Sequence, residues 1–212
     1  MIDLIDSAIA GRITTCLSWL ERWGGLVIPV QRKVQHGNAW TTRTFPVSCS
    51  VDPQCEDDSK FQKILPNSAY KSVGYLQQIG DARTLFNGPR ENMLVATYRL
   101  RLVVWLNYLK LGIDDCRQAG AFEVETIGNL KRDFSISSDQ LEQAGLLRLS
   151  RFSILPKDPA QVFNPYYMPD SAHIYFWPYG FFAIEFDAVA SINLSCLSAL
   201  ETGLETECLT SW

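Results

Sequence analysis

The chain has 212 residues, 47% of them hydrophobic and 20% charged, which is an ordinary balance for a globular protein. This composition excludes intrinsic disorder, collagen and coiled-coil arrays. The 19 basic and 23 acidic residues give a net charge of −4, which argues against a dedicated DNA-binding module, because such modules usually carry a basic stripe.

The charge is unevenly distributed along the chain. Residues 1–110 hold 13 basic and 9 acidic side chains, whereas residues 111–212 hold 6 basic and 14 acidic ones. Either one region meets its opposite on a neighbouring copy, or both halves fold into one domain whose surface mixes the charges.

The sequence contains neither a cysteine pattern nor a nucleotide-binding motif that would predict a cofactor. The six cysteines form no CxxC pair and no zinc-ligand spacing, so we expect reduced thiols, no metal and no cofactor. The sequence has no GxGxxG motif and no P-loop. We expect no signal peptide, because Asp3 and Asp6 stand where basic residues belong, and no membrane span, because no run of about 18 apolar residues occurs.

The first half of the chain changes from a helical period to a period of two. Residues 2–22 predict an amphipathic helix that ends at Gly24 and Gly25. Its apolar stripe consists of Ile2, Ile5, Ile9, Ile13, Leu17 and Leu20. The elements expected after it are strands over 26–34 and 43–51, an acidic loop over 52–60, a short strand over 72–78 and a turn at 87–89.

Two unusually long strands are predicted over residues 94–108 and 182–196. Every even position in both segments is apolar or a cysteine, which predicts half-buried strands with the even positions in the core. At about 3.3 Å per residue, such a strand reaches about 50 Å, whereas ordinary strands have about 3–10 residues.

The remaining elements complete a single α+β domain over residues 1–197, followed by an acidic tail over 198–212. A helix is predicted within 115–133, a short helix over 138–144 with Ser138 at its N-cap, and strands over 146–155 and 173–177. A hairpin turn at 177–180 joins the last of these to the second long strand. The order predicts a mainly antiparallel sheet with the N-terminal helix and one or two further helices on one face.

Four charged residues on the long strands form a candidate cluster, which we predict to be part of a protein interface. Glu185 and Asp187 lie two apart on one strand face, and although paired carboxylates can act in glycosidases, a solvated strand face gives the same pattern. Arg99 and Arg101 match them on the other long strand. If the strands are neighbours the charges pair across the sheet; on different subunits they would set the register of an assembly, and contact with a nucleic-acid backbone is a third reading.

Eight aromatic residues lie between Tyr166 and Phe182. A core absorbs part of such a set, but Trp177, Pro178 and Tyr179 fall at a turn, where side chains are normally exposed. Tryptophan and tyrosine are enriched at protein interfaces. We therefore predict that these three residues contact another protein chain.

The segments YRLRLVVWLN at 98–107 and GFFAIEFDA at 180–188 resemble the ring proteins between portal and tail of tailed bacteriophages, namely head-completion, tail-adaptor and tail-terminator proteins. The resemblance implies a non-enzymatic virion protein without catalytic residues, forming a homo-oligomeric ring that contacts portal, adaptor or tail proteins and through which DNA passes as cargo. The physical argument agrees, because a strand of about 50 Å projects beyond a domain of this size and needs a neighbour to cover its edges.

Two alternatives stay open at this point. The chain could be a soluble enzyme or a small-molecule-binding domain that uses the aromatic region 166–182 as a pocket wall. It could also be a bacterial accessory factor that binds one partner protein.

Overall fold

The computed structural model describes residues 2–36, 39–48, 62–87, 93–115, 120–131, 134–138, 141–166 and 172–193. The helical elements among them are α1 (Ile2–Cys16), α2 (Gly120–Leu130), α3 (Pro159–Val162) and the 3₁₀ helix η3 (Ala172–Tyr175). The strands are β1 (Arg22–His36), β2 (Ala39–Ser48), β3 (Gln62–Lys63), β4 (Ser72–Gln78), β5 (Arg83–Asn87), β6 (Met93–Asn107), β7 (Phe134–Ser138), β8 (Leu141–Ile154) and β9 (Tyr179–Asn193).

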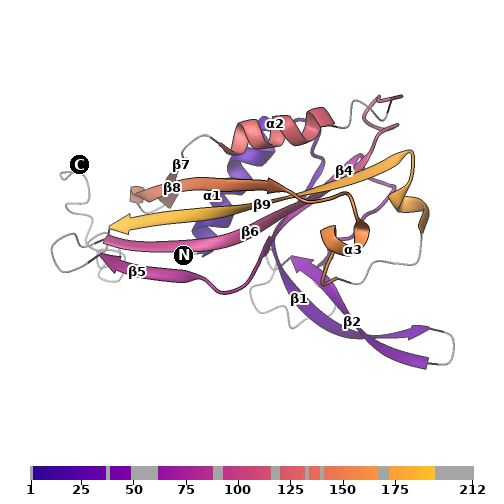
Figure 1. Ribbon diagram of the computed structural model, residues 1–212, viewed down its shortest axis with the longest axis horizontal. Coiled ribbons are helices and arrows are strands. Elements are labelled where there is room, and N and C mark those ends of the chain that lie inside the picture. Colours follow the sequence, from indigo (N-terminus) through magenta and orange to yellow (C-terminus); the bar gives the residue numbers. More distant parts are fainter. Residues whose placement is uncertain are drawn as a thin grey trace.

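These strands form one sheet in the order β3-β2-β1-β4-β6-β9-β8-β7, with β5 paired to β6 beside that path. The β1–β4 pair is parallel, and the other pairs are antiparallel. The α+β class, the mainly antiparallel sheet and the N-terminal helix are therefore confirmed (Figure 1).

The centre of the sheet is the pair of long strands. Strands β6 and β9 are each 15 residues long and pair without a break from Met93↔Asn193 to Asn107↔Tyr179. Both long strands are confirmed within the described residues. The pairing leaves β9 with no free edge over most of its length, because β8 occupies its other side.

One face of the sheet is covered by α1 and α2. Ile5, Ile9 and Ile13 of α1 are completely buried and pack against the even positions of β6 and β9, as their helical spacing predicts. Trp19 follows the helix, stacks edge-on against Phe122 of α2 and is buried as well. This layer is the larger of two hydrophobic cores.

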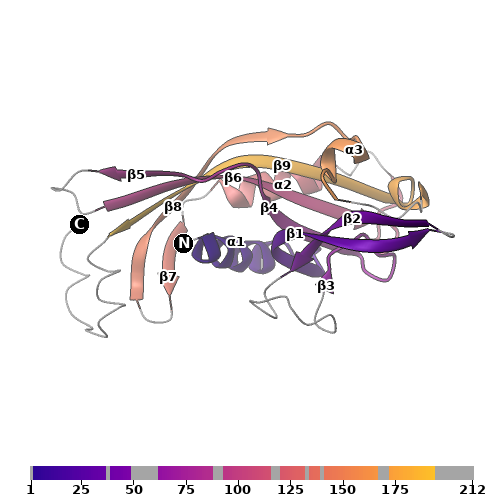
Figure 2. The same cartoon turned by 90° about the horizontal axis from the view of Figure 1, so that it is seen from below.

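The opposite face carries the second core, which the alternating pattern did not predict. Val103 and Trp105, at odd positions of β6, are buried under Val162 and Phe163. The segment with α3 thus covers this face while α1 lies on the other (Figure 2). At residues 102–108 the even positions are buried in the first core as predicted, but the odd positions are buried as well, so this part of the strand is not half-buried.

Three expectations for local structure are wrong. Gly24 and Gly25 do not end the helix; they lie inside β1, where Gly25 has φ 65° at an irregularity in the β1–β4 register. Helix α1 ends at Cys16 because the chain must turn back to enter the sheet at Arg22.

The segment 138–144 is not helical where the structure describes it, because Ser138 is the last residue of β7 and residues 141–144 belong to β8. The antiparallel pairing of β7 with β8, which joins Ser138 to Leu141, outweighs the local capping signal at Ser138. The segment 173–177 is not a strand either; residues 172–175 form η3, and Ile174 packs in the second core.

The other predicted elements are present with shifted ends. Residues 26–34, 43–48 and 146–154 lie in β1, β2 and β8, 72–78 are β4, and α2 falls within 115–133. The acidic loop 52–60, most of the turn 87–89 and the tail 198–212 lie outside the described residues.

Candidate interaction surface

The four predicted charged residues meet on one face of the β6–β9 pair. Arg101 stands directly opposite Glu185, and Arg99 stands opposite Asp187. Arg101 donates from Nε and Nη2 to Oε1 of Glu185 at 3.1 and 2.7 Å, and Arg99 donates from Nη2 to Oε2 at 2.7 Å. The two long strands are therefore neighbours in the sheet, and their charges pair within a single chain, as the first of the three alternatives expects.

Glu185 is held as a carboxylate by these contacts. Its side chain is 10% exposed and that of Arg101 13%. Burial alone would raise the pKa of Glu185, but the hydrogen bonds and positive charges of Arg101 and Arg99 outweigh it and lower that pKa. The buried charges are thus compensated, as a stable fold requires.

Asp187 pairs differently from the prediction. Its carboxylate lies 3.4 Å from Nη1 of Arg151, which is on β8 and has φ 55° at an irregularity in the β8–β9 register. Arg151 is 84% exposed, so this ion pair contributes little to stability. No pattern in the sequence predicts this pair, because the register shift that brings Arg151 to Asp187 depends on the pairing of β8 with β9.

Arg101 also fastens the segment 159–166, which we call the lid, to the sheet. Its Nη1 donates to the backbone carbonyls of Gln161 and Asn164, both at 3.1 Å. At the start of the lid Asp158 caps α3, accepting a hydrogen bond from the amide of Ala160 at 3.0 Å. Arg101 was singled out as an interface residue, and the structure gives it this internal role.

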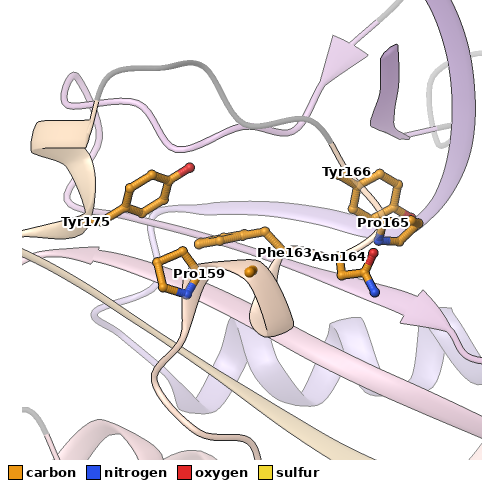
Figure 3. A pocket seen from close by; sticks show the side chains of 7 residues that line it. Pro159, Phe163, Asn164, Pro165, Tyr166 and Tyr175 are labelled. Carbon is orange, nitrogen blue, oxygen red and sulfur yellow. The ribbon is translucent and has the colours of Figure 1, made fainter. Parts of the chain in front are cut away.

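The lid and η3 line an open surface cavity of about 260 Å³ (Figure 3). Its walls are mainly proline and aromatic side chains, contributed by Pro159, Ala160, Phe163, Asn164, Pro165, Tyr166 and Tyr175. Tyr166 and Tyr175 belong to the aromatic region that the sequence picked out. The other five lining residues were missed, because only the fold of the lid brings them together.

The phenols of Tyr166, which lines the cavity, and of Tyr75, which lies behind it, are neutral at physiological pH. Burial raises the pKa of Tyr166 to about 12 although Arg101 opposes the rise. Behind it Tyr75 packs edge-on at 6.1 Å between ring centroids, and burial raises its pKa well above the ordinary value of 10.0. The cavity is therefore suited to an uncharged, largely apolar group.

The three predicted turn residues lie at the end of the β6–β9 pair, next to this cavity. Trp177 stacks on Tyr108 at 5.8 Å between centroids and is still 49% exposed, while Tyr179 stacks on Trp105 at 5.1 Å. The Trp177–Pro178 peptide is cis. Trp177 therefore presents an exposed aromatic face, and Tyr179 serves mainly to pack the second core.

A second surface, which the sequence analysis did not single out, is the end of the β1–β2 hairpin. Strand β4 pairs with β1 only as far as Val27, and β3 pairs with β2 only at Val47 and Ser48. Beyond these points residues 28–36 and 39–44 form a two-stranded ribbon, which we call the arm, projecting from the body (Figure 1). At about 3.3 Å per residue, His36 lies about 30 Å beyond Val27.

The arm is basic and has exposed apolar side chains. Residues 22–48 hold four basic and no acidic residues, which leaves 15 basic and 23 acidic ones in the rest of the chain, a balance of −8. Arg32 and Arg43 stand directly opposite each other, and Trp40 near the tip is 64% exposed. This charge bias was readable from the sequence, but the projection was not.

Comparison with known sequences assigns no function. No protein-family model matches the chain, and a search of curated proteins finds no significant match. In the part of the chain that the structure describes, no helix is long and apolar enough to cross a membrane. Among the same residues, no three histidine, cysteine, aspartate or glutamate side chains are grouped so that they could bind a metal ion.

Proposed function

We propose that the protein is a structural component of a tailed-bacteriophage virion that forms a homo-oligomeric ring in the neck or tail. The single observation that carries this proposal is the arm, a basic two-stranded ribbon that leaves the body of the molecule. The other support is the resemblance of segments 98–107 and 180–188, which form the long central pair.

The arm has the properties of a segment that is completed by a neighbour. A two-stranded ribbon is at best marginally stable in water by itself, and unpaired strand edges promote association. Within the described residues, each arm strand pairs with the other alone, so both outer edges are open. Strand addition or side-chain insertion on another chain would satisfy them.

The charges favour a second copy as that neighbour. Residues 22–48, which include the arm, carry four basic and no acidic residues, and the rest of the chain carries a balance of −8. A contact between two different surfaces of identical chains repeats around an axis and closes into a ring when the rotation permits.

The ring proposal also gives roles to the predicted partners. Portal, adaptor or tail proteins would contact the two ends of the ring, and the exposed Trp177 is a candidate anchor for such a contact. DNA would pass through the ring as cargo, and the acidic body would keep it from binding tightly.

A second candidate function rests on the cavity under the lid. Its proline and aromatic walls suit a small apolar molecule, as the pocket alternative expects. Its volume of about 260 Å³ lies below the range of roughly 300–1,000 Å³ that is usual for ligand pockets. A ligand would therefore have to be no larger than one side chain.

Electron microscopy tests the ring proposal. Negatively stained purified protein should show closed rings, and gold-labelled antibodies against the chain should mark the head–tail junction or the tail of the particle that contains it. Uniform single molecules together with unlabelled particles would contradict both parts of the proposal.

A further inference from the structure

Trp40 is the most conspicuous unexplained side chain on the arm. It stands opposite Gln35 near the tip and is 64% exposed, in a ribbon that is otherwise polar and basic on that face. Its face also carries Gln31, Lys33 and Thr42. A large aromatic side chain held at the end of a projecting ribbon is suited to inserting into a pocket of a partner.

The cavity under the lid has the size and chemistry of such a pocket. At about 260 Å³ it is smaller than the usual site for a drug-sized ligand but large enough for one bulky side chain. Pro159, Phe163 and Pro165 provide apolar walls, and the phenol of Tyr166 is neutral. Arg101, the charged side chain that contacts the lid, is already paired with Glu185 within the chain.

The arm cannot reach the cavity of its own chain. Val27, at the base of the arm, packs in the same core as Phe163 of the lid. Trp40 pairs with Gln35, eight residues farther along β1, which places it about 26 Å away at about 3.3 Å per residue. A straight ribbon holds that separation, so only another molecule can offer its cavity to Trp40.

We propose that the arm of one copy docks on the lid of a second copy and inserts Trp40 into the cavity formed by Pro159, Phe163, Pro165, Tyr166 and Tyr175. The partner is a second copy of this chain, since the basic arm then meets a chain whose residues outside 22–48 have a balance of −8. The arm and the cavity are different surfaces, so the contact is head-to-tail and propagates around a ring. This inference rests on the proposed self-assembly and names the contact that produces it.

Two variants that disable opposite sides of the contact test the inference. Trp40→Ala removes the inserted side chain, and Ala160→Phe fills the cavity from an exposed lid position without changing either core. Each variant alone should associate roughly thirtyfold or more weakly than the wild type in light scattering. A mixture of the two should form dimers and stop there, because one intact arm can then meet one intact cavity.

The outcomes separate this inference from the proposed function. Val124→Ala, at a 71% exposed position on α2, is the matched control and should assemble like the wild type. Assembly of Trp40→Ala at wild-type strength, or a mixture that stays monomeric, would overturn the docking while leaving the ring proposal intact. A wild-type protein that is itself monomeric would contradict the proposed self-assembly and the docking with it.

Discussion

At the scale of single residues, Glu185 of β9 is connected to the lid through Arg101 of β6. It accepts from Arg101 and Arg99, and Arg101 in turn holds two carbonyls of the lid. The alternation of β6 and β9 was sufficient to predict that these charges meet. It did not predict the lid carbonyls, because they come from residues about 60 positions away that only the tertiary fold brings close.

Glu185→Gln should lower stability in a pH-dependent way. The pKa of Glu185 is lowered in the folded protein, so its contribution is fully present above the ordinary value of 4.5 and is lost as the pH falls through the folded pKa. Urea unfolding should show a loss of about 1–3 kcal/mol at pH 7 that vanishes in acid. A loss that is equal at all pH values would contradict this account.

When the variant is compared with the wild type, the contributions of other acidic groups to the pH dependence of stability cancel. Asp6, whose pKa burial raises, changes stability in the opposite sense but does so equally in both proteins. Asp187→Asn is the control and should cost less than about 1 kcal/mol, because its partner Arg151 is exposed.

Gly180 is required by the stacking at the end of the long pair. A Cβ at this position would clash with the ring of Tyr108, which is buried and stacked on Trp177. Gly180→Ala should therefore cost roughly 1–3 kcal/mol in urea unfolding. Gly128→Ala in α2, where a Cβ meets nothing within 4 Å, should be neutral or stabilising, and equal effects at both positions would contradict the packing described.

At the scale of elements, the strands with a clear period of two were predicted and the segments governed by tertiary contacts were not. Strands β6 and β9 follow from their apolar alternation, although burial on both faces hides the pattern at residues 102–108. The described residues of the helix expected at 138–144 lie in β7 and β8, because the pairing between these two strands decides their structure. The arm was predicted as two strands, but the neighbours of a strand cannot be read from its own sequence.

Arg101→Lys should loosen the lid without unfolding the sheet. A lysine cannot reproduce the fork that bonds Glu185 and both lid carbonyls. Losing about 1.5–3 kcal/mol of hydrogen bonding should speed amide exchange in the lid roughly tenfold to hundredfold. Hydrogen-exchange mass spectrometry should detect the faster exchange at Val162, Phe163 and Tyr166, whose amides donate hydrogen bonds to nearby carbonyl groups.

The amides of β6 and β9 should keep their exchange rates in this variant. Arg99→Lys is the matched control, because Arg99 is 61% exposed and binds only the carboxylate of Glu185 among the lid and strand groups described. Faster exchange across the whole sheet would show that Arg101 supports the global fold rather than the lid.

At the scale of the whole molecule, the arm and the exposed aromatic end lie toward the same end of the long axis (Figures 1 and 2). The second core joins them, since Val27 at the base of the arm and Ile174 of η3 both pack in it. Among the described residues, the exposed tryptophans Trp40 and Trp177 thus lie toward the same end as the basic ribbon. Such a distribution is expected of a subunit that works in an assembly.

Assembly should weaken as salt concentration rises, because the arm is basic and the body acidic. Lys33→Glu, which places an acidic group on the arm, should weaken association by about 1 kcal/mol, or about fivefold, at low salt. Lys131→Glu, an equal change of charge at the end of α2, should have no such effect in sedimentation velocity. Identical behaviour of the two variants would show that net charge, rather than the arm, governs association.

The most direct test of self-assembly is the mass of the wild-type protein in solution. Size-exclusion chromatography with light scattering, well above micromolar concentration and at low salt, should give one discrete species whose mass is a multiple of 24.0 kDa. A mass of 24.0 kDa at every concentration would contradict the account.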